Sequence, residues 1–439
     1  MAAEVIHLYE CGITSIHLGY ELSKSITDYL PLVFFFKLIR HLISTGSRSS
    51  VPRTSLIRCS GHSHTTYKNS IATRVTPILC MEAEAVAAMA VTYDKAARVL
   101  FWGGVSFVLA SLLTFVGLAS WWLTFLANWT LASATYLTLA SLKVLPAGKA
   151  VLITGCDSGF GYATALFLDR MSFRVFACCL LAHSGGEGAQ RLRREGSRRL
   201  HVLQLDVTKQ EQIDSALQNV KNLLPPGEVL WGLVNNAGIN PYGAVEWVSM
   251  DDYRKTCEVN LFGTIAVTKS FLPLIRRAKG RVVNVGSVRG RMTSPLGAAY
   301  EVTKYGVEAF SDCLRHEMRR FGVDVSIIEP GNFTLGTGIF TAENNLRFSK
   351  KMWEEMSDEV KADYGKETFD EVLKRQIEHS KTGHGDVSEV SEAIAEALTQ
   401  RFPQSRYQPM QLFYYVMVFV SQHFPEWLYD YLYIEYLMK

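Results

Sequence analysis

The feature that most constrains the fold of this chain is a series of short apolar runs, each separated from the next by a polar stretch that could form a helix. The runs are Ala150–Ile153, Arg174–Leu180, Leu200–Leu205, Val229–Val234, Arg281–Val285 and Val323–Ile328. Continuous apolar strands that alternate with helices are typical of a parallel sheet covered on both faces. The sequence therefore predicts an α/β fold with a doubly wound parallel sheet of the Rossmann type. Its ligand site should lie at the carboxyl ends of the strands.

The first run leads into a glycine-rich turn, TGCDSGFG at residues 154–161. Glycines at this spacing let the backbone turn tightly and approach a pyrophosphate, which then rests on the N-terminus of the following helix. A glycine trio alone is weak evidence, but one that follows a strand and opens a helix predicts a dinucleotide cofactor.

A second motif, AAYEVTKYGVEAF at residues 298–310, contains Tyr300 and Lys304 at the start of a predicted helix. At this spacing the two side chains rise from one helix face, about 5–6 Å apart at Cβ. A nearby cation favours the phenolate form of a tyrosine, so we expect Lys304 to lower the pKa of Tyr300 from its usual value of about 10. The pair is then a candidate acid and base.

These motifs resemble the short-chain dehydrogenase/reductase superfamily from about Lys149 to Phe333. The spacing TGxxxGxG is followed in order by NNAG at residues 235–238, Asn260 within VNLFGT, Ser287, the Tyr300 pair, and Pro330-Gly331. One departure is Gly286, where many members have serine. The nearest branch holds retinol dehydrogenases, 17β-hydroxysteroid dehydrogenases and D-3-hydroxybutyrate dehydrogenase.

The resemblance implies hydride transfer at a CH–OH group, with Tyr300 as acid/base and Ser287 binding the substrate oxygen. It further implies that Lys304 holds the nicotinamide ribose, that Asn260 supports a proton-relay water, and that Asp206 binds the adenine amino group. The implied cofactor-binding residues are Thr154, Gly155, Asp157, Ser158, Gly159, Phe160, Gly161, Asp206, Val207, Asn235, Ala237, Gly238, Tyr300, Lys304, Pro330 and Gly331.

The charges around the turn favour NAD over NADP. The second strand ends in Cys178-Cys179-Leu180 and so supplies no acid to bind the ribose hydroxyl of NAD. A base for the 2′-phosphate of NADP is also missing, because Ser158 stands where phosphate-binding members often carry one. Asp157 adds a negative charge inside the turn. A 2′-phosphate would lack a partner and meet repulsion.

The region that precedes the catalytic domain differs from it in composition. Val99–Leu142 is 44 residues long and carries no charged residue, which is enough for two bilayer crossings. Basic residues on both sides favour a hairpin anchor with both ends in the cytoplasm and a turn near Asn128. One long crossing and a buried soluble helix are the alternatives. Residues 1–80 form a basic extension that is either disordered or a targeting segment, which leaves the endoplasmic reticulum and the mitochondrion open as locations.

The remaining regions bear on the substrate, a small alcohol or ketone. A catalytic domain at residues 149–400 includes an expected lid, Thr334 to about Thr382, with an apolar face that lines a pocket or packs in a core. Residues 401–439 are rich in aromatic side chains, which suits a membrane interface, a cover over the cleft or a contact in a homo-oligomer. The membrane features favour a lipophilic steroid or retinoid alcohol, and D-3-hydroxybutyrate is the alternative. Arg289 and Arg291 are placed to meet an acidic substrate.

Other classes of function are less favoured. The net charge of +3 on 439 residues predicts no nucleic-acid partner. The eight cysteines show no zinc spacing, so we expect no metal, and they are better explained as buried hydrophobes than as disulfides. A nucleotide-binding sensor without catalysis is the alternative from another class, although all four catalytic positions are filled.

Overall fold

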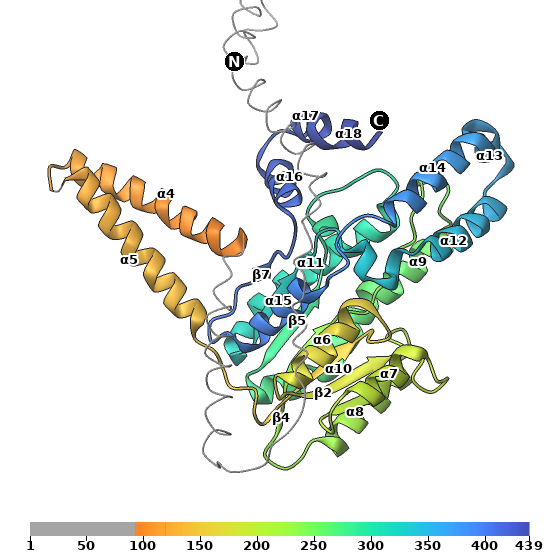
Figure 1. Ribbon diagram of the computed structural model, residues 1–439, viewed down its shortest axis with the longest axis horizontal. Coiled ribbons are helices and arrows are strands. Elements are labelled where there is room, and N and C mark those ends of the chain that lie inside the picture. Colours follow the sequence, from red (N-terminus) through yellow and green to blue (C-terminus); the bar gives the residue numbers. More distant parts are fainter. Residues whose placement is uncertain (1–92, 119, 439) are drawn as a thin grey trace, which may run out of the picture. The chain divides into compact units, whose positions relative to one another are not determined.

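The computed structural model describes residues 93–118 and 120–438, so the expected extension at residues 1–80 lies outside the described residues. The described part contains a 7-stranded sheet in the order β3-β2-β1-β4-β5-β6-β7, with every neighbouring pair parallel (Figure 1). The strands are β1 Lys149–Thr154, β2 Arg174–Cys179, β3 Leu200–Gln204, β4 Val229–Asn235, β5 Arg281–Val285, β6 Asp324–Ile328 and β7 Arg406–Tyr407. The doubly wound fold is confirmed, and each predicted strand ends within one residue of its expected bounds.

The strands are apolar throughout because both faces of the sheet are buried. In β1, Val151 and Ile153 join one core while Ala150 and Leu152 join the other. The first core packs against α6 Gly159–Arg170, α7 Glu187–Glu195 and α15 Ser388–Thr399, and the second against α8 Gln210–Leu223, α10 Gly263–Ala278 and α11 Ala298–Met318. Cys178 and Cys179 lie in opposite cores as free thiols, as their adjacent positions in a strand predict.

Two helices precede the sheet, α4 Tyr93–Phe115 and α5 Trp121–Ser141. They pack against each other through Phe107 and Trp121, whose ring centroids are 5.3 Å apart. The predicted turn near Asn128 is wrong, because Asn128 lies inside α5. The chain turns instead at Gly117, whose φ of +73° is a left-handed conformation that glycine adopts without strain. Among the described residues, one helix, Lys95–Phe115, is long and apolar enough to cross a bilayer.

The expected lid folds as the short 3-10 turns Thr334–Gly336 and Gly338–Phe340, followed by α12 Ala342–Glu355, α13 Asp358–Tyr364 and α14 Lys366–His379. Its apolar face packs in a small core with Trp247 and Phe369, so core packing, rather than a pocket lining, is the role of most of that face. Leu346 departs from the expected face, because its side chain is 52% exposed.

The remaining described elements complete the fold: α9 Met250–Cys257, the π-helix η2 Glu258–Phe262, the 3-10 helices η3 Val288–Gly290 and η4 Arg319–Phe321, α16 Leu412–His423, α17 Glu426–Tyr429, the π-helix η7 Asp430–Ile434 and α18 Glu435–Met438. The aromatic C-terminal segment is partly buried, with Tyr429 and Tyr433 in contact through rings 5.3 Å apart.

Candidate active site

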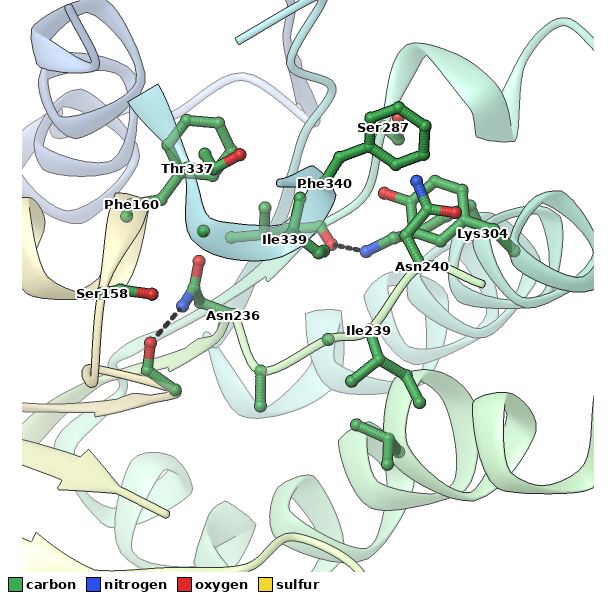
Figure 2. Close-up of a pocket in the computed structure, with 18 of the residues that line it drawn as sticks. Ser158, Phe160, Asn236, Ile239, Asn240, Ser287, Lys304, Thr337, Ile339 and Phe340 are labelled. Carbon is green, nitrogen blue, oxygen red and sulfur yellow. Dashed lines mark hydrogen bonds between the residues drawn. The ribbon is translucent and has the colours of Figure 1, made fainter. Parts of the chain in front are cut away.

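A cavity of about 860 Å³ lies at the carboxyl ends of the strands. Its walls come from the turn after β1, the chain after β3, β4, β5 and β6, and the lid. The sheet order reverses between β1 and β4, and ligands of open α/β sheets bind at such a switch point. Figure 2 shows Ser158 and Asn236 at one end of this cavity and Ser287, Asn240 and Lys304 at the other.

The glycine turn has the geometry that a bound pyrophosphate requires. Gly155 and Gly159 have φ values of +69° and +57°. A side chain at Gly161 would stand 2.3 Å from the carbonyl oxygen of Gly155, so only glycine fits there. Ser158, Gly159 and Phe160 line the cavity, so the N-terminus of α6 lies at its wall, a position that suits an anion.

Hydrogen bonds join this turn to the end of β4. The backbone N–H groups of Asn236 and Ala237 donate to Thr154 Oγ1, each at 3.0 Å. The Asn236 side-chain Nδ2 donates to the carbonyl oxygens of Thr154 (2.9 Å) and Gly155 (3.0 Å). Asn236 lines the cavity and was missed from the predicted set, although its place in the NNAG motif was a sufficient signal.

Most predicted cofactor-binding residues line the cavity, but Thr154, Gly161 and Asn235 do not. Thr154 and Gly161 act on the shape of the turn. Asn235 is buried behind the site, where its Nδ2 donates to Thr268 Oγ1 (2.9 Å) and Asn284 Oδ1 (2.8 Å). The residues that do line it are Gly155, Asp157, Ser158, Gly159, Phe160, Asp206, Val207, Ala237, Gly238, Tyr300, Lys304, Pro330 and Gly331.

Two carboxylates fix the nucleotide end of the cavity. Asp157 accepts from the backbone N–H groups of Leu180 (2.8 Å) and Leu181 (3.1 Å), directly after β2. Asp206 Oδ1 accepts from the backbone N–H (2.9 Å) and the hydroxyl (2.7 Å) of Thr208. The carboxylate of Asp157 therefore lies next to the end of β2, a strand that supplies no acid of its own.

Ser287 and Tyr300 meet in the same cavity. Ser287 follows β5, and it lines the cavity together with Tyr300, which stands in the first turn of α11. Burial raises the pKa of Tyr300 to about 12, although the bond with Ser287 and the charge of Arg289 both lower it. The expected lowering of this pKa by Lys304 is therefore wrong: burial outweighs the neighbouring charges, and Lys304 Nζ lies 5.4 Å from the ring centroid.

Lys304 is held from behind the active site. Its Nζ donates to the carbonyl oxygen of Val285 at the end of β5 (2.9 Å), and its side chain is buried. Burial lowers the pKa of Lys304 to about 8, against a smaller opposing effect of Glu308. The ammonium is thus fixed close to Tyr300 but is easily deprotonated.

Asn260 is the predicted catalytic residue that the cavity does not reach. Its Oδ1 accepts from the backbone N–H of Ile239 (2.8 Å), and its Nδ2 donates to the Ile239 carbonyl (2.9 Å) and Thr303 Oγ1 (3.0 Å). It lies in the π-helix η2, a type of bulge that is frequent at functional sites. Asn260 therefore links the chain after β4, through Ile239, to α11, through Thr303.

Further side chains that line the cavity include Arg289, Tyr242, His379 and Tyr414. Arg289 was expected near an acidic substrate, and it does line the cavity. Arg291 does not, because its guanidinium pairs with Glu329 at 3.2 Å and bonds Gln422. Tyr242, His379 and Tyr414 were missed, because they come from the chain after β4, α14 and α16 and share no local motif.

Comparisons with known proteins agree with this geometry. Residues 149–345 match the family described as short chain dehydrogenase. The chain is 47% identical to mitochondrial D-beta-hydroxybutyrate dehydrogenase of Rattus norvegicus over 298 residues, 68% of this chain and 87% of that protein. It is 48% identical to retinol dehydrogenase 7 of Rattus norvegicus over 261 residues, 59% of this chain and 80% of that protein. It is 45% identical to 17-beta-hydroxysteroid dehydrogenase type 6 of Homo sapiens over 260 residues, with the same two shares, 59% and 80%.

A solved short chain dehydrogenase/reductase from Burkholderia phymatum, in complex with NAD, has the same fold. The TM-score is 0.51 at 23% identity, covering 63% of this chain and 94% of that one. The fold, the cavity and these relatives lead to one conclusion. The chain belongs to the short-chain dehydrogenase family and is an oxidoreductase that acts on a CH–OH group.

Proposed function

We propose that this protein is an NAD-dependent dehydrogenase that interconverts a short 3-hydroxy acid of the 3-hydroxybutyrate class and its 3-oxo acid. The observation that carries the proposal is the extent of the similarity, which spans 298 residues with the hydroxybutyrate enzyme and 261 with the retinol enzyme. The stretches KKMWEEMSDEVKADYGKETFDE and RYQPM, which resemble the hydroxybutyrate enzyme, belong to α12–α14 and the chain around β7. The likeness therefore extends into the lid.

The residues of the cavity have distinct roles in this reaction. Ser287 hydrogen-bonds the substrate oxygen and places it against the phenol of Tyr300. In the oxidising direction Tyr300 takes the hydroxyl proton as the carbinol carbon loses its hydride, and in the reducing direction it returns that proton to the ketone oxygen. The glycine turn and Lys304 would hold the nicotinamide cofactor, which when bound would supply the hydride chemistry. With its pKa raised to about 12, Tyr300 holds its proton at pH 7, which is the form that the reducing direction needs, and the oxidation gains from rising pH.

The preference for NAD over NADP is part of the proposal. It is supported by Asp157, whose carboxylate is bound to the backbone of Leu180 and Leu181. A 2′-phosphate on the adenine ribose would meet that charge at close range. An NADP(H) preference of tenfold or more in kcat/KM would contradict this part.

A membrane location is also proposed. The helix Lys95–Phe115 has the length and apolarity to anchor the enzyme in a bilayer. Both the mitochondrion and the endoplasmic reticulum stay in the proposal, because the hydroxybutyrate relative is named as mitochondrial while the apolar anchor suits either membrane. A tagged full-length chain compared with one that begins at Met81 would separate the two.

A lipophilic alcohol of the retinoid or steroid class is the second candidate substrate. It is favoured by the apolar side chains that line the cavity from the lid side, Ile339, Phe340 and Phe348. The relatives at 48% and 45% identity that act on such alcohols by name also support it.

The test is NAD⁺ reduction by D-3-hydroxybutyrate, retinol and estradiol, measured side by side on the full-length protein in detergent or vesicles. We expect kcat/KM for D-3-hydroxybutyrate to exceed the other two at least tenfold. Tyr300→Phe should abolish turnover and leave NADH binding intact, while Tyr305→Phe, exposed on the same helix, should change little. Turnover of retinol or estradiol alone would overturn the substrate, and an active Tyr300→Phe would overturn the site.

A further inference from the structure

We propose that Arg289, together with Tyr242 and Tyr414, forms the subsite that binds the carboxylate of the substrate. This inference rests on the proposed function for the identity of the acid, and it assigns that acid a recognition site. All three side chains line the same cavity as Ser287 and Tyr300, and they come from η3, the chain after β4, and α16.

The position of Arg289 relative to the reacting atoms fits a 3-hydroxy acid. Its backbone N–H donates to Ser287 Oγ at 3.1 Å, so its side chain starts beside the group that binds the substrate oxygen. In a 3-hydroxy acid the carboxylate carbon lies only two bonds from the carbinol carbon. A cation that recognises this acid must therefore stand next to Ser287 and Tyr300, as Arg289 does. A retinol or an estradiol carries no such charge.

The guanidinium of Arg289 is not fully satisfied by the protein. Its Nη1 is buried and has no hydrogen-bond partner among the described residues. A buried donor without a partner costs about 1–3 kcal/mol, and more for a charged group. The side chain as a whole is 21% exposed and belongs to the cavity lining. The carboxylate of a ligand is the partner that a planar guanidinium binds best.

The nearest carboxylate, that of Glu301, does not supply the missing hydrogen-bond partner of Arg289. Glu301 Oε1 lies 3.7 Å from Arg289 Nε, which is an ion pair but too long for a hydrogen bond. The Glu301 carboxylate is already occupied by Ser294, through its backbone N–H at 3.1 and 3.2 Å and its hydroxyl at 2.9 Å. Glu301 thus forms an ion pair with Arg289, while Arg289 Nη1 stays without a hydrogen-bond partner among the described residues.

The surroundings of Arg289 are suited to a small anion. Tyr242 and Tyr414 line the cavity, with the Tyr242 hydroxyl donating to the carbonyl oxygen of Pro295 at 3.3 Å, and the Tyr433 ring packs against the guanidinium with its centroid 5.7 Å away. Burial, and next the charge of Arg289, lower the pKa of His379, another basic group of the cavity lining. Lys304 is the second cation near Ser287, but its Nζ already donates to the carbonyl oxygen of Val285, so Arg289 is the cation with an unpartnered donor.

The test compares Arg289→Met with Arg277→Met in the full-length protein. Arg277 is exposed on α10 and is not among the residues that line the cavity, so its variant removes an equal charge outside the site. kcat/KM is measured with NAD⁺ for D-3-hydroxybutyrate and for butan-2-ol, which lacks the carboxylate. We expect Arg289→Met to lower kcat/KM for the acid roughly 10- to 150-fold, as for a lost hydrogen bond to a charged group. The value for butan-2-ol should stay within about threefold, and Arg277→Met should change both within that range.

A second measurement does not depend on turnover. Butyrate binding to the enzyme–NADH complex is followed by NADH fluorescence, and NADH affinity itself reports whether each variant is folded. Wild type and Arg277→Met should bind butyrate alike, and Arg289→Met at least tenfold more weakly. If wild type binds butyrate through Arg289 but does not oxidise D-3-hydroxybutyrate, the subsite stands and the proposed substrate is wrong. The subsite is wrong if wild type does not bind butyrate, or if Arg289→Met binds butyrate equally well. It is also wrong if Arg289→Met lowers kcat/KM for D-3-hydroxybutyrate and for butan-2-ol to the same degree.

Discussion

Tyr300 and Lys304 share one helix face, yet burial moves their pKa values in opposite directions. It raises the pKa of Tyr300 to about 12 and lowers that of Lys304 to about 8. Both shifts favour the neutral forms. The charge on Lys304 is therefore unfavourable at neutral pH. In the proposed reaction it has a use, because the ammonium lies next to the phenol of Tyr300.

Lys304→Met should therefore raise the free energy of unfolding at pH 7. A lysine with a folded pKa of about 8 and an ordinary value of 10.5 binds fewer protons when folded, so its cost is full below pH 8 and disappears as the pH rises to 10.5. After loss of the bond to Val285, we expect a net gain of about 1–2 kcal/mol at pH 7. Urea unfolding at pH 7 and at pH 10.5 measures it.

The matched control for that prediction is Lys269→Met, an exposed lysine on α10, which should change stability by less than about 0.5 kcal/mol. A Lys304→Met protein that is less stable at pH 7, or a gain that persists at pH 10.5, would contradict the sign derived from burial.

Among the secondary-structure elements, the lid is the one that has its own small core. Phe369 of α14 is 3% exposed and its ring lies 5.1 Å from that of Trp247 and 4.9 Å from that of Trp353. Because Trp247 belongs to the chain before α9, Phe369 helps to join α12 and α14 to the body of the protein, together with the ion pair between Lys351 and Asp252.

Phe369→Ala should loosen the lid rather than the sheet. Removal of a buried phenylalanine costs about 3–5 kcal/mol, so we expect a raised KM and faster hydrogen exchange across residues 342–379. The strands should keep their protection. Leu346→Ala, on the exposed face of α12, is the control and should leave both unchanged. Unfolding of the whole chain in Phe369→Ala would show that the lid is not a separate unit.

The elements also show what the sequence could predict. The strands β1–β6 were predictable because burial on both faces leaves a continuous apolar run, whereas the two residues of β7, Arg406 and Tyr407, carry no such pattern. Ser287, Tyr300 and Lys304 were predictable because short-range spacing fixes them. Tyr242, His379 and Tyr414 were not, because only the tertiary fold brings their segments together. The turn after α4 was misplaced because Gly117 was overlooked.

For the whole molecule, the main proposal is attachment to a membrane through α4. Leu109 and Leu112 of α4 are 41% and 59% exposed, so water would meet an apolar surface there. An arginine at the centre of a spanning helix costs roughly 2.5–3.5 kcal/mol. The double variant Leu109→Arg, Leu112→Arg should move the protein from the carbonate-resistant membrane fraction into the soluble one.

The control for membrane attachment is Leu223→Arg at the end of α8, which is 39% exposed on the catalytic domain and should leave the protein in the membrane fraction. A double variant of α4 that still resists carbonate extraction would show that α4 is not the anchor.

The bonds that Asn236 makes to the carbonyl oxygens of Thr154 and Gly155 tie the two halves of the sheet together at the edge of the cavity. Separation of the halves and loss of the nucleotide end are therefore one event. A dinucleotide that binds only the folded chain stabilises it by about 2.7 kcal/mol at a hundred times its Kd. Degradation in the cell follows the population of the open form when reclosing is fast. The size of the local nicotinamide pool then governs the lifetime of the enzyme against proteases as well as its rate of turnover.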